Sequence, residues 1–379
     1  PPSMEFTFVE NTSRWTAALR SIESQKSEGC RLIHDPLSKY FSNDHLQVFK
    51  ACMGVELTEE DVDRVVHEYG SQGKASLTPD QCKLAVLVDR LAVRSIWIDT
   101  CILDAARQKG RPCQVVSLGA GLCSRPWRLP AVDMGHIHYF EIDTKSVLGY
   151  KKNIIQHEKA QMTCAEYSCV TADVCDVHSW AIQLLEAGFN PRHRTVWVAE
   201  GLSGYLTVEA NVKVIHQIRL MSSPGSQAIY TFNGVSDKLT NSHKLCTDEP
   251  ADFIVHHLGG FARGRQTSLF NEASRHGRAT YMEITSRVEE ADRAKYSKAC
   301  NAAGNTRKAG NYWLVRAEIL PSPVLTYEDI ESPFLYTLKN EFFSRHQHDQ
   351  SEMKHDSLRM AIRNTFLHCD GLCMAPAFV

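Results

Sequence analysis

Two glycines separated by one residue, Gly119 and Gly121, follow a short apolar run that begins at Cys113. Such glycines let the backbone turn tightly and approach a ligand with no side chain in the way. A dinucleotide fingerprint needs a third glycine where the next helix packs closely, but Arg125 and Pro126 follow instead. The pattern therefore disfavours a pyrophosphate and favours a nucleoside that carries an amino-acid part.

Acidic residues follow the second apolar run, which begins at His138. Glu141 and Asp143 lie about twenty residues beyond the glycines, where the ribose-binding acid of a nucleoside site belongs. A carboxylate can accept hydrogen bonds from both ribose hydroxyls. Taken alone, the Gly-x-Gly pattern is equally typical of an ordinary turn between a strand and a helix.

These residues need a sheet to position them, and the hydrophobic pattern predicts one. Apolar runs alternate with helical stretches, which indicates an α/β fold with a mostly parallel sheet covered by helices on both faces. We expect seven strands, at residues 113–118, 138–142, just before Asp173, 195–199, 227–232, 281–285 and 312–319.

The remaining segments divide the chain into a cap, a core and an extension. Apolar residues recur at helical spacing in the first hundred residues, so we expect residues 1–100 to form a helical cap. The core is predicted over 101–320, with a lid inserted at about 233–265 above the reacting end of the ligand. Residues 321–379 read as an extension whose role the pattern does not indicate.

Composition excludes several classes of protein. The 379 residues carry a formal charge of −2, from 42 basic and 44 acidic side chains, so nothing favours nucleic acid as a partner. The sequence predicts no membrane span and no signal peptide, and the thirteen scattered cysteines indicate free thiols. We expect a soluble cytoplasmic protein. Metal binding is not predicted, because pairs such as Cys164 and Cys169 lack a second pair of ligands.

Four strings resemble, in order and spacing, the leucine carboxyl methyltransferase-like family of S-adenosylmethionine-dependent O-methyltransferases. They are SLGAGLCSRPWRL, YFEIDTKSVLGYKKNII, AGFNPRHRTVWVAEGLSGYLT and SSPGSQAIYTF. The resemblance extends from Arg14 through the segment at Arg94 to residues 312–319. It implies a Rossmann-like class I methyltransferase fold with S-adenosylmethionine as the cofactor.

The resemblance also implies roles for individual residues. Arg94 matches an arginine that grips the carboxylate of the methionine moiety, a role that suits a guanidinium. The other matched positions are Gly119 and Gly121 at the turn, Asp143 with Glu141 at the ribose, Asp173 and Val174 at the adenine, Glu200 facing the cofactor, and Tyr205 near the methyl transfer. Arg14 is a looser match to a basic residue beside the cofactor carboxylate.

The sequence departs from the family at one informative place. Where the family usually reads GAGLDTR, this chain has Cys123 and Ser124, so an acid that commonly anchors the turn is missing. Whatever that acid contacts must be held in another way. Residues 41–84 and the extension after residue 320 have no clear counterpart, so the resemblance does not indicate the acceptor.

We expect methyl transfer to the oxygen of a small molecule. A carboxylate acceptor is already ionised at neutral pH, whereas a hydroxyl needs a base. The candidate bases are Tyr205, His243, His256 and His257, and Arg263 with Arg265 could recognise an anionic acceptor from the lid. Two alternatives stay open: a methyltransferase for protein C-terminal carboxylates, and a non-catalytic binding or scaffold protein with this fold. The oligomeric state is not predicted.

Overall fold

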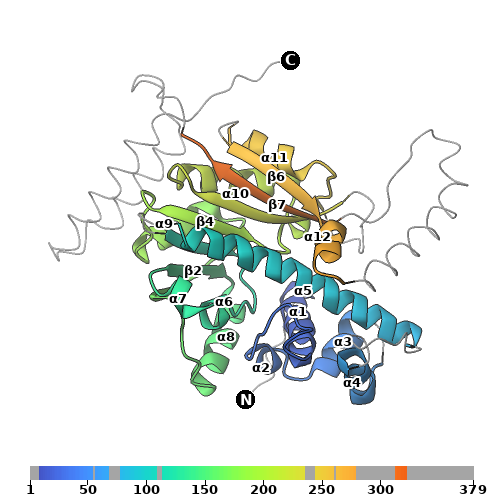
Figure 1. The fold of residues 1–379 in the computed structure, drawn as a ribbon. Coiled ribbons are helices and arrows are strands. Elements are labelled where there is room, and N and C mark those ends of the chain that lie inside the picture. Colours follow the sequence, from blue (N-terminus) through green and yellow to red (C-terminus); the bar gives the residue numbers. More distant parts are fainter. Residues whose placement is uncertain are drawn as a thin grey trace, which may run out of the picture.

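We describe a computed structural model that covers residues 8–53, 56–67, 77–108, 113–234, 244–259, 262–278 and 312–321. Its centre is a sheet of seven strands in the order β3-β2-β1-β4-β5-β7-β6 (Figure 1). The strands are β1 (Cys113–Leu118), β2 (His138–Asp143), β3 (Glu166–Thr171), β4 (Arg194–Ala199), β5 (Gln227–Asn233), β6 (Ala262–Ser268) and β7 (Tyr312–Ile319).

Strands β1 to β5 run parallel, and β6 and β7 pair antiparallel at one edge. All six residues of β1 and of β4 are buried, as expected for central parallel strands that helices cover on both faces. The prediction of a seven-stranded, mostly parallel sheet is therefore confirmed, with one strand placed differently. The expected strand at 281–285 lies outside the described residues, and β6 at 262–268 was not predicted.

Helices cover both faces of the sheet. They are α1 (Phe8–Gln25), α2 (Ser38–Ser42), α3 (His45–Met53), α4 (Glu59–His67), α5 (Pro79–Ala106), α6 (Arg125–Arg128), α7 (Ala131–Met134), α8 (Lys145–His157), α9 (Val177–Glu186), α10 (Val208–Leu220), α11 (Pro250–His257), α12 (Leu269–Arg275) and the short 3-10 turn η1 (Ser203–Tyr205).

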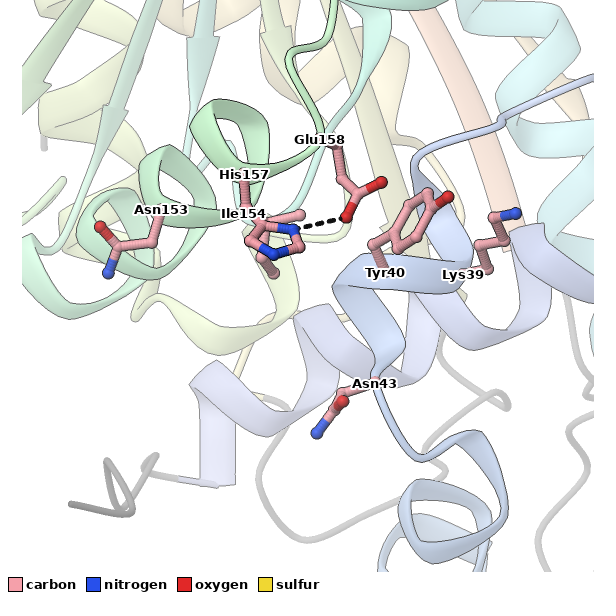
Figure 2. Close-up of a pocket in the computed structure, with 7 residues that line it drawn as sticks. All are labelled: Lys39, Tyr40, Asn43, Asn153, Ile154, His157 and Glu158. Carbon is pink, nitrogen blue, oxygen red and sulfur yellow. Dashed lines mark hydrogen bonds and ion pairs between the residues drawn. The ribbon is translucent and has the colours of Figure 1, made fainter. Parts of the chain in front are cut away.

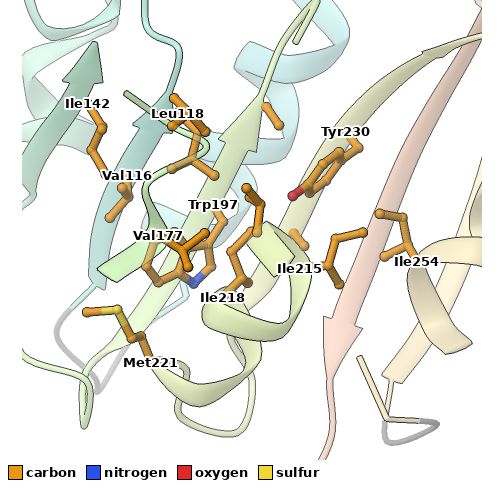
Figure 3. Packing of buried hydrophobic residues seen from close by; sticks show 14 of the residues in the cluster. Val116, Leu118, Ile142, Val177, Trp197, Ile215, Ile218, Met221, Tyr230 and Ile254 are labelled. Atoms are coloured by element: carbon orange, nitrogen blue, oxygen red, sulfur yellow. The ribbon is translucent and has the colours of Figure 1, made fainter. Parts of the chain in front are cut away.

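The largest hydrophobic cluster lies between the sheet and helices α9, α10 and α11. Trp197 of β4 and Tyr230 of β5 project into it, and Ile215 and Ile218 of α10 meet them there (Figure 3). Trp197 is fully buried and its indole N–H donates to the Ser222 hydroxyl at 2.8 Å. This cluster packs α9, α10 and α11 against the strands whose carboxyl ends lead into the loops described below.

The long helix α5 joins the cap to the sheet (Figure 1). Thr78 caps its first turn, in a reciprocal box with Gln81. Its first half packs with α1 through Leu84 and Val88, and its second half packs on the opposite face of the sheet through Ile98 and Ile102. At 28 residues it spans about 42 Å, so one helix carries Arg94 from the cap to the sheet.

From Pro250 onward, the segment expected to form a lid at 233–265 has regular secondary structure, and its role as a lid stays a prediction. That part forms α11 and the edge strand β6, which pairs with β7 along its whole length. The strand was missed because its sequence, ARGRQTS, is polar, as is typical of an edge strand that faces water on one side. Residues 235–243 of the expected lid lie outside the described residues.

Candidate functional site

The glycine turn comes directly after β1, where the chain leaves the carboxyl edge of the sheet. Gly119 has a φ of 58° and Gly121 a φ of 53°, a region that residues with a side chain rarely adopt. A Cβ at Gly119 would lie 3.0 Å from Leu202, and one at Gly121 would lie 3.2 Å from Ser13 of α1. Backbone conformation and close neighbours therefore both require glycine at this turn.

Asp143, the last residue of β2, is bonded to the glycine turn. Its Oδ2 accepts from the Gly121 N–H at 2.6 Å, and its Oδ1 accepts from the Thr144 N–H at 2.7 Å. Burial raises the pKa of Asp143, while the hydrogen bond from Gly121 works in the opposite direction. The structure thus brings the predicted turn and the predicted ribose acid together as one hydrogen-bonded unit.

Glu141 does not belong to this hydrogen-bonded unit. Its side chain is fully buried and forms an ion pair with Lys151 of α8 at 2.5 Å, and its Oε2 also accepts from the Tyr167 hydroxyl at 2.7 Å. Burial raises the pKa of Glu141, and Lys151 opposes that rise. Both carboxylate oxygens of Glu141 are engaged by Lys151 of α8, and its role beside the ribose stays a prediction.

Asp173 and Val174 follow β3, beside Asp143. The two loops are joined by the Ala172 N–H, which donates to the Asp143 carbonyl at 3.0 Å. Asp173 is exposed, and its Oδ1 accepts from the Cys175 N–H at 2.8 Å. The Val174 side chain packs in the core, and its carbonyl accepts from the Trp180 indole N–H at 3.0 Å. Asp173 therefore presents a carboxylate at the expected edge, while Val174 supports the loop from beneath.

Glu200 follows β4 and forms an ion pair with Arg94 of α5. The Arg94 Nε donates to Glu200 Oε1 at 2.8 Å, and the exposed fractions of the two side chains are 15% and 18%. Although burial opposes ionisation, the guanidinium groups of Arg125 and Arg94 hold the pKa of Glu200 well below its usual range. The pair places a fixed cation and a fixed anion next to each other.

Arg125, at the start of α6, was not predicted to be a site residue. It is buried, its Nη1 donates to Glu200 Oε2 at 2.7 Å, and its Nε donates to Asp99 Oδ1 at 2.7 Å. Arg128 holds both oxygens of Asp99. The sequence carries a signal for this residue, because Arg125 ends the string GAGLCSR, which stands where the family usually reads GAGLDTR.

A second unpredicted residue, Tyr312 of β7, lies at the other end of the same network. Its hydroxyl accepts from Arg94 Nη1 at 3.3 Å and donates to Thr231 Oγ1 at 2.8 Å. The Gly201 N–H also donates to that threonine oxygen, at 2.7 Å. The antiparallel strand β7 therefore supports Arg94 and the loop after β4.

The cap is fastened to the segment after the glycine turn by a buried ion pair. Asp35 accepts from Arg20 Nε at 2.7 Å and from the Ser124 hydroxyl at 2.5 Å, and Arg20 Nη2 donates to the Leu122 carbonyl at 2.5 Å. Burial opposes ionisation of Asp35, but Arg20 and Arg128 lower its pKa. Arg14 donates to the Ser42 carbonyl at 3.2 Å and also interacts with Tyr150 of α8.

Two further residues lie near the ion-pair network: Cys123, beside Arg125, and Tyr205, on the loop that carries Glu200. The Cys123 thiol lies 3.4 Å from Arg125 Nη1 and 3.9 Å from the Tyr139 hydroxyl, at the position where the family usually carries an acid. The arginine is neutralised by Glu200 and Asp99 instead. Tyr205 is half-buried in η1, five residues beyond Glu200, on the same loop.

The other candidate residues lie away from the glycine turn. Arg263 is paired with Glu318, which is level with the beginning of β5 and hence at the opposite edge of the sheet, and Arg265 follows it on β6. Strand β6 is four positions from β1, or about 19 Å. His256 and His257 end α11, where their rings contact each other. Recognition of an acceptor by Arg263 and Arg265 stays a prediction that their position on the sheet does not favour, and His243 lies outside the described residues.

A pocket of about 440 Å³ lies elsewhere, between α2 and the last turn of α8 (Figure 2). Tyr40 and Asn43 form one wall, and Asn153 and His157 form the other. Helix α8 begins two residues after Asp143 and rises about 20 Å over its 13 residues, so its far end lies about that distance from Asp143. This pocket is separate from the candidate site.

The described residues contain no group of three His, Cys, Asp or Glu side chains that could hold a metal ion. Within the same ranges, no helix combines the length and apolar character needed to cross a bilayer.

The charged and hydrogen-bonding groups of the site can be compared with those of an amino-acid nucleoside. The Arg94 and Glu200 pair offers a cation for a carboxylate and an anion for an ammonium group, and Asp143 offers acceptors for hydroxyls. Glycines at this turn carry no side chain, so the backbone there can approach such a ligand closely. These residues lie at the carboxyl ends of adjacent parallel strands, where open α/β sheets bind ligands.

The strand order, the antiparallel β7 and the cluster at the carboxyl edge define a class I methyltransferase fold. The sequence profile of the leucine carboxyl methyltransferase family matches residues 13–219. The chain belongs to this family of S-adenosylmethionine-dependent methyltransferases.

Individual relatives agree with this assignment. A protein of Parafrankia sp., named as a predicted S-adenosyl-L-methionine-dependent methyltransferase, is 34% identical over 150 residues, which cover 39% of this chain and 46% of that protein. A Mycolicibacterium smegmatis protein of the same description is 33% identical over 231 residues, covering 59% and 67%. The chain thus spans between about half and two thirds of these relatives' lengths.

Among solved structures, a Haemonchus contortus phosphoethanolamine N-methyltransferase in complex with S-adenosylhomocysteine is similar to this chain. It is 14% identical and has a TM-score of 0.36, with 59% of this chain and 53% of that chain covered.

Proposed function

We propose that this protein transfers the methyl group of S-adenosylmethionine to an oxygen of a small molecule, a carboxylate or a hydroxyl. The observation that carries the proposal is the Arg94 and Glu200 ion pair, 2.8 Å between Nε and Oε1, beside the glycine turn. Family membership supports the same reaction class.

In this proposal each residue has a distinct task. Arg94 binds the carboxylate of the methionine moiety, and Glu200 attracts its ammonium group. Asp143 holds the ribose hydroxyls, and Asp173 receives the adenine amino group. Gly119 and Gly121 allow the backbone to lie against the ligand. When bound, S-adenosylmethionine supplies a sulfonium methyl group that an oxygen nucleophile can attack in line.

The chain itself contributes positioning more than proton transfer. Holding two reactants at attack distance converts a bimolecular step into one that is effectively unimolecular. A carboxylate acceptor requires no base, because it is ionised at neutral pH. For a hydroxyl acceptor, Tyr205 is the candidate that would share a proton, since it is half-buried on the loop that carries Glu200.

A second candidate function is methylation of a protein's C-terminal carboxylate, which the description of the matched family favours. Incubation of a cell extract with the protein and methyl-labelled cofactor separates the two. Label in the small-molecule fraction, lost in the Arg94→Met variant, is the expected result. Label in protein that base treatment releases would favour the second candidate.

No label in either fraction would favour the scaffold alternative, provided that the protein still binds S-adenosylhomocysteine. No binding and no label would contradict the proposed function as a whole.

A further inference from the structure

Two arginines share one carboxylate at the centre of the site. Arg94 donates to Glu200 Oε1 at 2.8 Å and Arg125 donates to Glu200 Oε2 at 2.7 Å. A carboxylate with both oxygens engaged cannot rotate without breaking one of these charge-assisted bonds. Arg125, which is not proposed to contact the ligand, therefore helps to fix the orientation of the Glu200 carboxylate.

Arg125 is in turn fixed from behind. Its side chain is 3% exposed, and its Nε donates to Asp99, whose two oxygens are also held by Arg128. The planar guanidinium thus uses one edge for Asp99 and another for Glu200. This chain of buried contacts joins α5, α6 and the loop after β4.

The charges around Glu200 do not balance within this network. The described groups linked by these ion pairs are Arg94, Arg125 and Arg128 on one side, and Glu200 and Asp99 on the other. Cys123, beside Arg125, brings a thiol rather than a carboxylate. One cation is left over, so a bound carboxylate can be taken up by Arg94 without leaving Glu200 unpaired, because Arg125 remains with it.

We propose that Arg125 is a positioning residue that keeps Glu200 in place as an anion while Arg94 engages the ligand's carboxylate. The inference rests on the proposed function, since it concerns the same site. When the ligand's carboxylate competes with Glu200 Oε1 for Arg94, Glu200 keeps its ion pair with Arg125 through Oε2. Arg94 can therefore turn to the ligand without leaving Glu200 without a cation. Without Arg125, ligand binding would leave a desolvated carboxylate with weaker compensation.

In the described part of the chain, charged and titratable groups from four elements surround Glu200. They are Arg94 of α5, Arg125 of α6, Arg20 of α1, and Tyr312 of β7, which reaches it through Arg94. Burial alone would raise the pKa of Glu200, and the arginines reverse that effect. Loss of Arg125 should therefore make ligand binding sensitive to pH as Glu200 becomes able to take up a proton.

The test is calorimetric titration of S-adenosylhomocysteine at pH values from 8 down to 4.5, with the ratio of variant Kd to wild-type Kd as the readout. That ratio cancels the titration of Asp143 and of the ligand, which occurs in both proteins. For Arg125→Met we expect a Kd about tenfold weaker at pH 8, with a ratio that grows as the pH falls. Arg125→Lys keeps the positive charge but loses the two-sided hydrogen-bonding geometry of the guanidinium. Its Kd ratio should therefore be smaller and should depend less on pH.

Two further proteins make the result specific. In Arg125→Met combined with Glu200→Gln, measured against Glu200→Gln alone, the dependence on pH should vanish. The control Arg107→Met removes an exposed arginine pair with Asp133 and should leave the ratio near one at every pH. If Arg125→Met does not fold, Arg125→Lys carries the test: a Kd ratio above that of Arg107→Met supports the positioning role, and a ratio equal to that of Arg107→Met overturns it.

A ratio that is flat with pH in a folded Arg125→Met protein, or unchanged affinity, would overturn the positioning role. Failure of the wild-type protein to bind S-adenosylhomocysteine would instead contradict the proposed function, so the two failures are distinguishable.

Discussion

The Gly121 N–H donates to Asp143 Oδ2 at 2.6 Å, so the turn after β1 and the acid after β2 form one unit. The proposed roles divide the ligand between this unit and the Arg94 and Glu200 pair. Asp143 should bind the nucleoside, and Arg94 should bind the amino-acid part.

Asp143→Ala should weaken binding of both S-adenosylhomocysteine and 5′-methylthioadenosine, by about tenfold or more, because both ligands carry the ribose hydroxyls. Arg94→Met should weaken only S-adenosylhomocysteine, because 5′-methylthioadenosine lacks the amino-acid carboxylate. Titration calorimetry with both ligands on both variants gives four values. Equal losses for both ligands in Arg94→Met would disprove the assignment of Arg94.

Gly121→Ala should destabilise the protein by about 1–2 kcal/mol, because a residue with a side chain is strained at a φ of 53° and its Cβ would press on Ser13. Gly149→Ala is the matched control. Gly149 lies within α8, and a Cβ there meets nothing within 4 Å, so alanine should stabilise the helix by about 0.5–1 kcal/mol. Urea unfolding measures both, and a neutral Gly121→Ala would contradict the geometry of the turn.

Asp35→Asn should cost about 3 kcal/mol of unfolding free energy, because it leaves Arg20 as a buried cation with a weakened partner. The pKa of Asp35 is lowered in the folded protein, so its contribution is present above the unfolded pKa of about 4 and is lost as the pH falls through the folded pKa. Denaturant melts between pH 7 and pH 3 should show the two proteins converging as the pH falls. A constant difference across that range would rule out the ion pair as the source.

Tyr205→Phe distinguishes the two acceptor chemistries. A hydroxyl acceptor that relies on Tyr205 should lose a factor of about 10²–10⁴ in kcat, whereas a carboxylate acceptor needs no base and should change little. Binding of S-adenosylhomocysteine should be unchanged in either case. A variant that loses cofactor affinity would place Tyr205 in cofactor binding instead.

The parts of the fold that the sequence predicted are those with a strong local pattern. Strands such as β1 and β4 are buried along their whole length and read as continuous apolar runs, so their positions were predicted closely. Strand β6 is polar and half-exposed at an edge, and only its pairing with β7 makes it a strand. The sequence did not predict β6 for that reason.

The sequence predicted the site only in part, because the role of each side chain depends on partners that are distant along the chain. Glu141 and Asp143 have the same residue character at the end of one strand, but Lys151 and Tyr167 occupy the first and the Gly121 N–H meets the second. Nothing in the local sequence distinguishes them. Arg125 was missed in the same way, because its importance comes from Glu200, 75 positions away along the chain.

The central claim is that the site binds an amino-acid nucleoside through the Arg94 and Glu200 pair, and calorimetry with S-adenosylhomocysteine tests it most directly. The account predicts saturable binding to the wild-type protein and a Kd weaker by about tenfold or more in Arg94→Met, with the surface variant Arg107→Met unchanged. No binding by the folded wild-type protein at millimolar ligand would contradict the account.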